Sequence, residues 1–560
     1  MKMSAARKRI GDLLLESGVI TEEQLKLALE KQRNTKMRLG DTLITMEFIT
    51  QQQFIEALEF QLGIPHVQLY RYKIDPKIVA LISQKLADQH CVIPLRIEGN
   101  KLVLAMADPL DYFAIDEIRI ATGLRIEPVI ASKNELVNAI NRYYGLQDTI
   151  EQITQNLQLR DLDEDTAIKD EDSPVVKTVN GIITQAVQLG ASDIHLDPQD
   201  SGFRVRYRVD GVIRTERTLP PGMHAIMAAR IKIMANMNVA ERRLPQDGRV
   251  ELEVDRRKID IRVATLPTIH GEKVVIRILD LGHSLADIKK LAFSERNERV
   301  FRSCIESAHG VVLITGPTGS GKSTTLYSAL AHLNRDDVNI ITVEDPVEFQ
   351  LEGVNQVQVN VNSGLTFARG LRSILRQDPN IIMLGEIRDS ETAEIAVRAA
   401  MTGHLVLSTL HTNSAVSSIS RLIDMGVEPF LISSSVNCII AQRLLRRICT
   451  ECSSSYEPND EEVTILKSNG FGAERLHRGT GCANCGRTGY KGRIAVHEVL
   501  NLDSKLRSLV MAKASDHEYD AHAMKQGMIP IMHDAINKAI SGFTTLSEVF
   551  RVLGQGDDQH

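Results

Sequence analysis

The sequence predicts an α/β protein built from several domains. Its 560 residues suggest about three to five domains at the usual domain size. In the second half, short continuous apolar runs such as Ile381–Leu384 recur between helical stretches, as is typical of buried parallel strands. From Asp161 to Asp172, seven of twelve residues are acidic and one is basic. That segment predicts a flexible, self-repelling linker between folded parts.

Composition limits the possible functions. Hydrophobic residues make up 43% and charged residues 25%, which are ordinary values for globular proteins. A net charge of -6 provides no general basic field, so we expect no nucleic-acid partner. No apolar run approaches the roughly 18 residues that span a bilayer, and the basic start of the chain is soon interrupted by acidic residues. We therefore expect a cytoplasmic protein, in which any membrane role acts through a partner.

The N-terminus holds an internal repeat. Residues 9–12 (RIGD) recur as residues 38–41 (RLGD), and in each copy a glutamine follows the arginine by 23 positions, at Gln32 and Gln61. Thr21 precedes the helical stretch of the first copy and is a plausible N-cap. The pattern predicts a tandem helical hairpin.

Residues 203–208 alternate between apolar residues and arginines, as in a β-strand, which places Arg204, Arg206 and Arg208 on one face. A solvated sheet face would show the same pattern, but three arginines in a row on one face more often meet phosphate.

Changes of character along the chain predict seven segments. They are a tandem helical repeat at 1–63, a small α/β module at 64–145, the acidic linker at 146–172, a second α/β module at 173–285, a core of buried parallel strands and helices at 286–445, a cysteine element at 446–495 and a helical region at 496–560.

A glycine-rich loop, Gly-Pro-Thr-Gly-Ser-Gly-Lys-Ser at residues 316–323, follows the apolar run 311–314 and leads into a helical stretch. This strand, loop and helix order is the setting in which backbone N–H groups close on phosphates. Lys322 would reach the β- and γ-phosphate oxygens, and the Ser323 hydroxyl would ligate Mg²⁺. The residues expected to bind ATP are Gly316, Thr318, Gly319, Ser320, Gly321, Lys322, Ser323 and Thr324.

Hydrolysis needs one acid that activates water and another on the magnesium side of the nucleotide. Glu344 and Glu348 follow the strand-like run 339–343, and Glu386 follows the run 381–384. Acids at the ends of parallel strands gather where α/β folds bind ligands. His404 and His411 bracket the run 405–408, and we expect both near the γ-phosphate.

Four of the seven cysteines form two C-x-x-C pairs about 30 residues apart, Cys449/Cys452 and Cys482/Cys485. This spacing predicts a Cys₄ zinc site in a reducing compartment. Four thiolates leave no open position on the metal, so a structural role is favoured over a catalytic one. Two redox dithiols or four free thiols are the alternatives.

Residues 174–500 resemble the secretion-superfamily ATPases that drive type II secretion and type IV pilus assembly. The resemblance is carried by residues 191–195, 206–211, 246–249, 316–323, 344–348, 385–389 and 403–413 and by the four paired cysteines. It implies a hexamer whose RecA-like core follows a PAS-like domain. It also implies that Glu348 is the water-activating base, with Glu344 as the alternative, and that Glu386 acts beside Mg²⁺. The other catalytic residues that it implies are Lys322, His411, Arg206, Arg208, Arg372 and Arg376, the four arginines as phosphate sensors between modules or subunits.

Retraction motors of this family typically lack both a long N-terminal region and the Cys₄ element. Because this chain has both, the resemblance implies a motor that extends a pilus through a polytopic inner-membrane platform protein. Three alternatives stay open: a type II secretion ATPase, a motor for DNA uptake, and a nucleotide-sensing scaffold with little turnover.

The N-terminal repeat is similar to the cyclic di-GMP-binding domain of the MSHA-type pilus ATPases, which carries two copies of an Arg-Leu-Gly motif ending in glutamine. Two copies suit a pseudo-twofold ligand, and arginine can fork onto its phosphates. Ile10 replaces a leucine, and Glu47 stands where the second copy expects a glycine. The alternative is a module that only docks a membrane partner. The residues implied as ligands are Arg7, Arg9, Ile10, Gly11, Asp12, Leu25, Gln32, Arg38, Leu39, Gly40, Asp41, Phe54, Leu58, Gln61 and Asp108.

Overall fold

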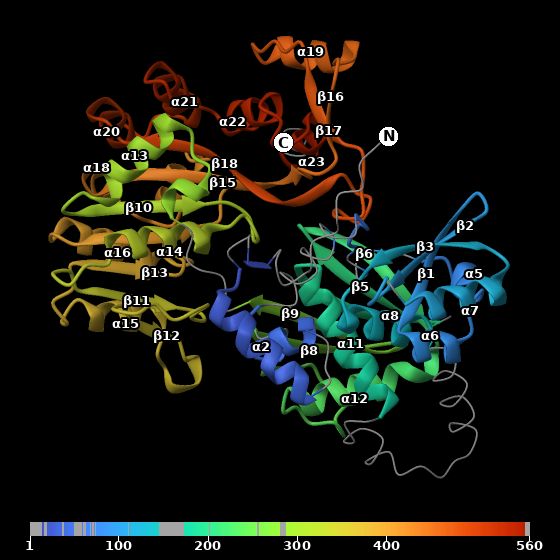
Figure 1. Cartoon of the computed structure of the whole chain (residues 1–560). Helices are drawn as coiled ribbons and strands as arrows, with labels where there is room; N and C mark the ends of the chain where they lie inside the picture. Colours follow the sequence, from blue (N-terminus) through green and yellow to red (C-terminus); the bar gives the residue numbers. More distant parts are fainter. Residues whose placement is uncertain are drawn as a thin grey trace. The chain divides into compact units, whose positions relative to one another are not determined.

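The computed structural model divides into two compact units, residues 1–254 with 261–278 and residues 255–260 with 279–560 (Figure 1). Each is described by itself. The described residues are 14–15, 19–35, 39–46, 48–49, 59, 63–67, 69, 72, 74–109, 111–144, 173–200, 202–254, 257–280 and 287–554. The predicted linker at 146–172 lies outside them.

The first unit begins with helices α2 (Glu22–Thr35) and α3 (Leu39–Thr45). Thr21 caps α2 as predicted: its hydroxyl accepts a hydrogen bond from the Gln24 N–H at 3.3 Å, and its own N–H donates to the Gln24 side chain at 2.9 Å. The two helices enclose a small apolar core that includes Leu14, Ala28 and Leu43.

A three-stranded module follows these helices. Its strands β1 (Val92–Glu98), β2 (Lys101–Met106) and β3 (Arg125–Ile130) lie in chain order, with an antiparallel first pair and a parallel second pair. The helices are α5 (Pro76–Val79), α6 (Gln84–His90), α7 (Tyr112–Thr122) and α8 (Lys133–Tyr143), and they share one core with the sheet.

The next module is a six-stranded sheet of order β6-β5-β4-β9-β8-β7 with two helices. Along β5 the residues Phe203, Val205 and Tyr207 are buried, and the arginines between them face the other way, which confirms the predicted alternation. The elements are α11 (Pro174–Gln188), β4 (Ala191–Gln199), β5 (Gly202–Val209), β6 (Val212–Leu219), α12 (Pro221–Met234), β7 (Gln246–Val254), β8 (Arg257–Thr268) and β9 (Gly271–Asp280).

The second unit is built on a seven-stranded sheet of order β12-β11-β13-β14-β10-β15-β18. The strands predicted from apolar runs are fully buried and pair in parallel: β10 (Gly310–Thr315), β11 (Ile340–Glu344), β13 (Ile381–Leu384) and β14 (Leu405–Leu410). β12 (Asn355–Gln358) forms one edge.

Helices cover both faces of this sheet (Figure 1). α13 (Glu295–Ile305) and α14 (Lys322–Leu333) pack on one face. The other face is covered by α15 (Phe367–Ile374), α16 (Ser390–Met401), α17 (Ser417–Asp424), α18 (Pro429–Ser435), α20 (Ser504–Met511) and α21 (Asp516–Lys525). Burial on both faces explains why the strands read as continuous apolar runs.

The last part of the chain extends from this sheet. β15 (Val436–Ile448) pairs in parallel with β10 and antiparallel with β18 (Tyr490–Asn501), so both long strands cross the segment boundaries predicted at 445 and 495. Beyond them lie β16 (Ser453–Tyr456), α19 (Asp460–Ser468), β17 (Leu476–Gly479), α22 (Ile531–Ile540) and α23 (Leu546–Leu553). Across the described parts of the chain, no helix has the length and apolar character to cross a membrane.

Candidate nucleotide site and cysteine cluster

The glycine-rich loop lies at the carboxyl end of β10 and packs against β15. β10 ends at Thr315, opposite Ala441, and the next residue of β15, Gln442, holds the loop. Its side chain donates to the Ser320 carbonyl at 2.8 Å and accepts from the Thr325 hydroxyl at 2.8 Å. A Cβ atom at Gly321 would lie 2.8 Å from the Gln442 Nε2 atom, so this close packing requires glycine.

Lys322 opens helix α14 and folds back over the loop. Its Nζ donates to the Gly316 carbonyl at 2.7 Å and to the Pro317 carbonyl at 3.2 Å. Burial lowers the pKa of Lys322 to about 8, the charge of Glu386 acts in the opposite direction, and the charge of Arg443 lowers it further. An ammonium group held this way is ready to exchange carbonyl oxygens for phosphate oxygens.

The rest of the loop leaves its polar groups available for an anion. The N-cap of α14 is Gly321, which gives the helix no side-chain cap, so the N–H groups of the first turn are open to phosphate. The Ser320 hydroxyl is buried without a hydrogen-bond partner. Thr318, Gly319, Ser323 and Thr324 are exposed around it.

Glu344 ends β11 in a buried position. One carboxylate oxygen accepts hydrogen bonds from the Thr342 hydroxyl at 2.6 Å and from Gln356 Nε2 at 3.1 Å, and the other accepts from the Tyr327 hydroxyl. Burial raises the pKa of Tyr327, and Glu344 adds to the effect, so that hydroxyl stays a donor. Glu348 is half-buried, and its backbone N–H contacts the Tyr327 oxygen at 3.3 Å.

Glu386 follows β13 and lies within electrostatic reach of Lys322. Arg388 Nη2 approaches one of its carboxylate oxygens to 2.5 Å, and His411 Nε2 lies 3.3 Å from the other. His411 follows the carboxyl end of β14. His404 precedes the opposite end of that strand, with Nδ1 2.9 Å from the Ala399 carbonyl. Of the two histidines, therefore, only His411 lies at the carboxyl end of the strands, beside Glu386.

Sequence reasoning missed Gln442 and Arg443. The signal that could have found them is the polar pair directly after the apolar run 438–441, which lies beside the end of β10. Arg443 Nη2 donates to the Asn413 carbonyl at 3.0 Å, and Nη1 donates to the Gln442 carbonyl at 3.1 Å.

Each of the four predicted sensor arginines contacts residues of its own unit, three of them a carboxylate. Arg206 contacts Asp197 at 2.5 Å, and Arg208 contacts Asp193 at 3.3 Å, on one face of the six-stranded sheet. In the second unit Arg372 contacts Glu391 at 2.5 Å. Arg376 donates to the Arg372 carbonyl at 2.8 Å and to the Ser373 hydroxyl at 3.2 Å.

Most residues expected to bind cyclic di-GMP lie outside the described part of the chain: Arg7, Arg9, Ile10, Gly11, Asp12, Arg38, Phe54, Leu58 and Gln61. Of the others, Leu25 and Gln32 are half-buried on α2, and Leu39 packs against the small N-terminal core. Gly40 and Asp41 belong to α3, and Asp108 is half-buried after β2.

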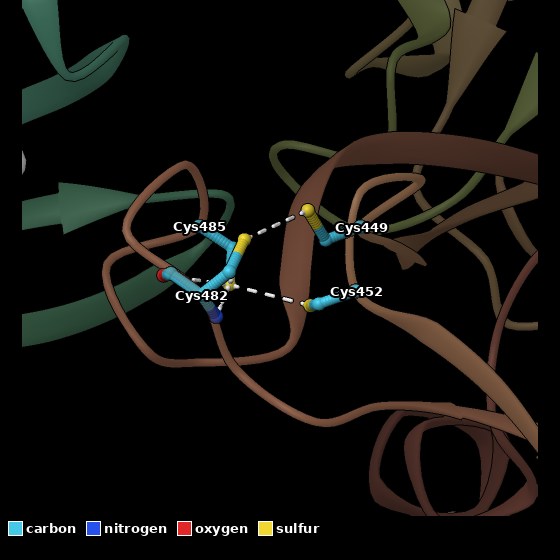
Figure 2. Close-up of side chains that lie close together, drawn as sticks. All are labelled: Cys449, Cys452, Cys482 and Cys485. Atoms are coloured by element: carbon cyan, nitrogen blue, oxygen red, sulfur yellow. Dashed lines mark hydrogen bonds between the residues drawn. The ribbon is translucent and has the colours of Figure 1, made fainter. Parts of the chain in front are cut away.

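The four paired cysteines converge, as predicted, with their sulfur atoms within 4.8 Å of one another (Figure 2). The Cys449–Cys482, Cys452–Cys485 and Cys482–Cys485 sulfur distances are each 3.8 Å. Tetrahedral zinc with Zn–S bonds of about 2.3 Å requires sulfurs about 3.8 Å apart, so the residues fit that metal. Backbone N–H groups of Cys482 and Gly489 each donate to Cys485 Sγ at 3.2 Å. They outweigh burial and lower the pKa of that thiol to about 7.

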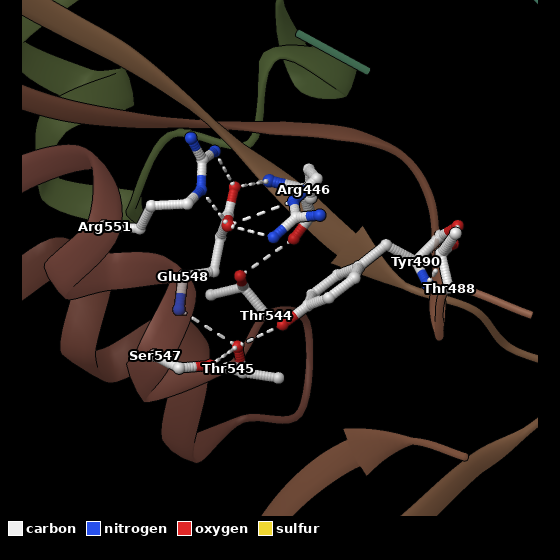
Figure 3. Close-up of polar contacts among 8 residues, drawn as sticks. All are labelled: Arg446, Thr488, Tyr490, Thr544, Thr545, Ser547, Glu548 and Arg551. Atoms are coloured by element: carbon white, nitrogen blue, oxygen red, sulfur yellow. Dashed lines mark hydrogen bonds and ion pairs between the residues drawn. The ribbon is translucent and has the colours of Figure 1, made fainter. Parts of the chain in front are cut away.

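A polar cluster connects β15 and β18, the strands on either side of the paired cysteines, to helix α23 (Figure 3). Glu548 of α23 is buried and accepts from Arg446 Nη2 at 2.7 Å and from Arg551 Nη2 at 2.5 Å. The Tyr490 hydroxyl is 2.7 Å from that of Thr545 at the start of α23, and the Arg446 guanidinium lies 4.1 Å from the centre of the Tyr490 ring.

Comparison with known proteins decides the family. Residues 168–551 match the family described as type II/IV secretion system protein. The chain belongs to this family. Its members include the type IV pilus assembly ATPase PilB of Myxococcus xanthus, 43% identical over 97% of this chain and 98% of that protein. The type II secretion system protein E of Xanthomonas campestris is 42% identical over 99% of each chain. The protein is accordingly an ATPase of the pilus-assembly and secretion type.

The remaining comparisons concern parts of this secretion ATPase. Residues 62–150 match the MshEN domain, a match that starts where the N-terminal repeat ends. The ATPase DotB of Legionella pneumophila aligns with 66% of this chain and 94% of its own, with a TM-score of 0.50 and 21% identity, which shows a shared fold. A structure described as MshE with cdg aligns with 25% of this chain and 100% of its own, with 39% identity and a TM-score of 0.24.

Proposed function

We propose that this secretion ATPase is a hexameric motor that extends an MSHA-type pilus by acting on an inner-membrane platform protein. The observation that supports ATP hydrolysis is that Lys322, Glu386 and the loop N–H groups converge at the carboxyl ends of the parallel strands. The Cys₄ cluster and the long N-terminal region support extension over retraction. A chain without a basic field is expected to move protein subunits and not nucleic acid.

In the proposed reaction, Glu348 activates the attacking water. Both carboxylate oxygens of Glu344 already accept protein hydrogen bonds in a buried site, which disfavours Glu344 as the base. Lys322 and the first turn of α14 bind the β- and γ-phosphates, and Ser323 and Glu386 lie on the Mg²⁺ side. Arg206, Arg208, Arg372 and Arg376 would exchange their present partners for phosphate, as sensors of the bound nucleotide.

The motor assignment is tested by Lys322→Ala in the full chain. Steady-state phosphate release and surface piliation should both be lost. Normal piliation in that variant contradicts the motor, and absent turnover in the wild-type protein favours a nucleotide-sensing scaffold. Loss of protein secretion with pili intact favours the type II secretion alternative. Mass photometry with ATP should show a particle six times the 62.3 kDa of one chain.

We further propose that cyclic di-GMP binds the N-terminal repeat and regulates the motor. The matched arginine-to-glutamine spacing and the adjoining MshEN match support this role. Calorimetry of the full chain should show binding that Arg9→Ala or Arg38→Ala removes, while Lys26→Ala, an exposed residue of α2, leaves it unchanged. No heat with the wild-type protein would leave the repeat as a docking module.

A further inference from the structure

Arg443 lies beside the nucleotide loop because of the register of β15. Since Thr315 pairs with Ala441, the two residues beyond Ala441 run alongside the loop that begins at Gly316. A Cβ atom at Gly316 would lie 3.1 Å from Arg443 Nη1. The guanidinium group therefore packs directly against the first glycine of the loop, whose carbonyl also accepts the Lys322 hydrogen bond.

Two cations thus share one small, partly buried site. The charge of Arg443 disfavours the protonated form of Lys322, and burial also lowers the pKa of Arg443 itself. Glu386 offsets the charge of Lys322, and Glu498 offsets that of Arg443. With the uncapped helix and the unpartnered Ser320 hydroxyl next to them, the two cations make an environment suited to a multiply charged anion.

The guanidinium group is held in place from two sides. Asn413, in the loop after β14, accepts through its carbonyl at 3.0 Å and its side-chain oxygen at 3.4 Å. Glu498 of β18 accepts from the Ala415 N–H at 2.9 Å and from the Ile531 N–H at 3.3 Å, so it ties the same loop to the start of α22. The Asn413 contacts use Nη2, and Nη1 donates to the Gln442 carbonyl at 3.1 Å, so the plane of the guanidinium group is fixed before a ligand arrives.

We propose that Arg443 is a second cationic ligand of the nucleotide's terminal phosphates, acting beside Lys322, and that Glu498 is its positioning residue. The inference rests on the proposed nucleotide site. Arg443 would supply a planar donor on the Gly316 side of the loop, opposite the N–H groups of α14. Its contribution is to binding of the ground state and the transition state alike, so loss of the charge should raise KM more than it lowers kcat.

The test measures binding of Mg²⁺-loaded AMP-PNP, a non-hydrolysable ATP analogue, to the full chain by calorimetry at two salt concentrations. Arg443→Gln should weaken binding about tenfold, the usual effect of one charge-assisted hydrogen bond, and reduce the salt dependence. Arg443→Lys keeps the charge and should recover most of the affinity. The matched control is Arg447→Gln, an exposed arginine four residues farther along β15, which should bind like the wild-type protein.

The outcomes separate this inference from the proposed site. Unchanged binding by Arg443→Gln, with binding lost in Lys322→Ala, overturns the role of Arg443 and leaves the nucleotide site standing. Normal binding by Lys322→Ala overturns both. Equal weakening by Arg443→Gln and Arg443→Lys, together with equal losses in thermal stability, shows a structural role and also overturns the inference. Glu498→Gln should weaken AMP-PNP binding about two- to threefold when Arg443 is present. It should have no further effect in a protein that already carries Arg443→Gln, because a positioning residue acts through its partner.

Discussion

The Tyr327 hydroxyl donates a hydrogen bond to the buried carboxylate of Glu344 and so links helix α14 to the end of β11. The same oxygen receives the backbone N–H of Glu348 at 3.3 Å. One phenol therefore donates to the first glutamate of this segment and accepts from the backbone of the second. Because α14 begins at Lys322, the Tyr327 side chain connects the helix that carries Lys322 to the segment that carries Glu348.

The two glutamates should respond differently to removal of their charge. Glu348→Gln should reduce the rate of ATP hydrolysis by roughly 10²-fold or more, as loss of a general base does, with nucleotide binding retained. Glu344→Gln places an amide donor among groups that already donate, and should destabilise the protein by about 1–3 kcal/mol. Phosphate release and thermal unfolding measure the two effects. The reverse pattern, with full turnover in Glu348→Gln, would assign the base to Glu344.

Tyr327→Phe tests the link itself. The ring stays, but one acceptor of the buried Glu344 carboxylate loses its donor, at a cost of about 1–3 kcal/mol. Because the Glu348 backbone N–H also loses its contact with the Tyr327 oxygen, kcat should fall about tenfold while KM for ATP changes little. Tyr456→Phe is a control, since that phenol bonds Glu462 at 2.6 Å in the cysteine region. If Tyr327→Phe lowers only stability, the link does not position Glu348.

The sequence alone predicted those elements whose pattern lies within a few neighbouring residues. The run Ile381–Leu384 is apolar because both sheet faces are covered, and it forms β13 with the predicted bounds. Thr21 directly precedes the helical stretch of the first repeat, and this position predicted the cap that its hydrogen bonds with Gln24 confirm. These patterns need no knowledge of a distant partner.

The pairing of strands that lie far apart in the chain could not be predicted from the sequence. Both histidines flank the same strand, but strand direction alone decides that His411 and not His404 meets Glu386. The pairing of β15 with β18 joins residues that are about 50 positions apart, and the polar residues within β15 conceal its apolar pattern. Arg443 was missed for that reason: it has meaning only once β10 is known to end beside it.

Removal of one cysteine should release zinc and loosen the cysteine loop. Cys452→Ser or Cys485→Ser should lower bound zinc from one per chain towards none, because three thiolates hold the metal much more weakly than four. Cys91→Ser, in the first unit, should keep full zinc. Metal content by plasma mass spectrometry and thermal unfolding with a chelator measure the effect. Full metal content in both variants would mean that the four thiols form no zinc site.

Glu548 should make the stability of the second unit depend on pH (Figure 3). Burial raises the pKa of this carboxyl, but hydrogen bonds from Arg551 and Arg446 outweigh it, so the folded-state pKa is lowered. A group with a lowered folded pKa contributes stability above its unfolded pKa, near 4.3 for glutamate, and loses it as pH falls through the folded value.

Glu548→Gln isolates this contribution, because a protonated glutamate resembles glutamine. At pH 7 the substitution should destabilise the protein by about 3 kcal/mol, since it leaves Arg446, whose side chain is only 16% exposed, without its charged partner. The difference from the wild-type protein should shrink as pH falls below about 4.3, because the wild-type carboxyl then protonates too. Glu474→Gln, at an exposed position, should match the wild-type protein throughout. Thermal unfolding between pH 7 and pH 3.5 measures the difference. A constant difference over that range would show that packing of the side chain, and not its charge, holds α23 against β15.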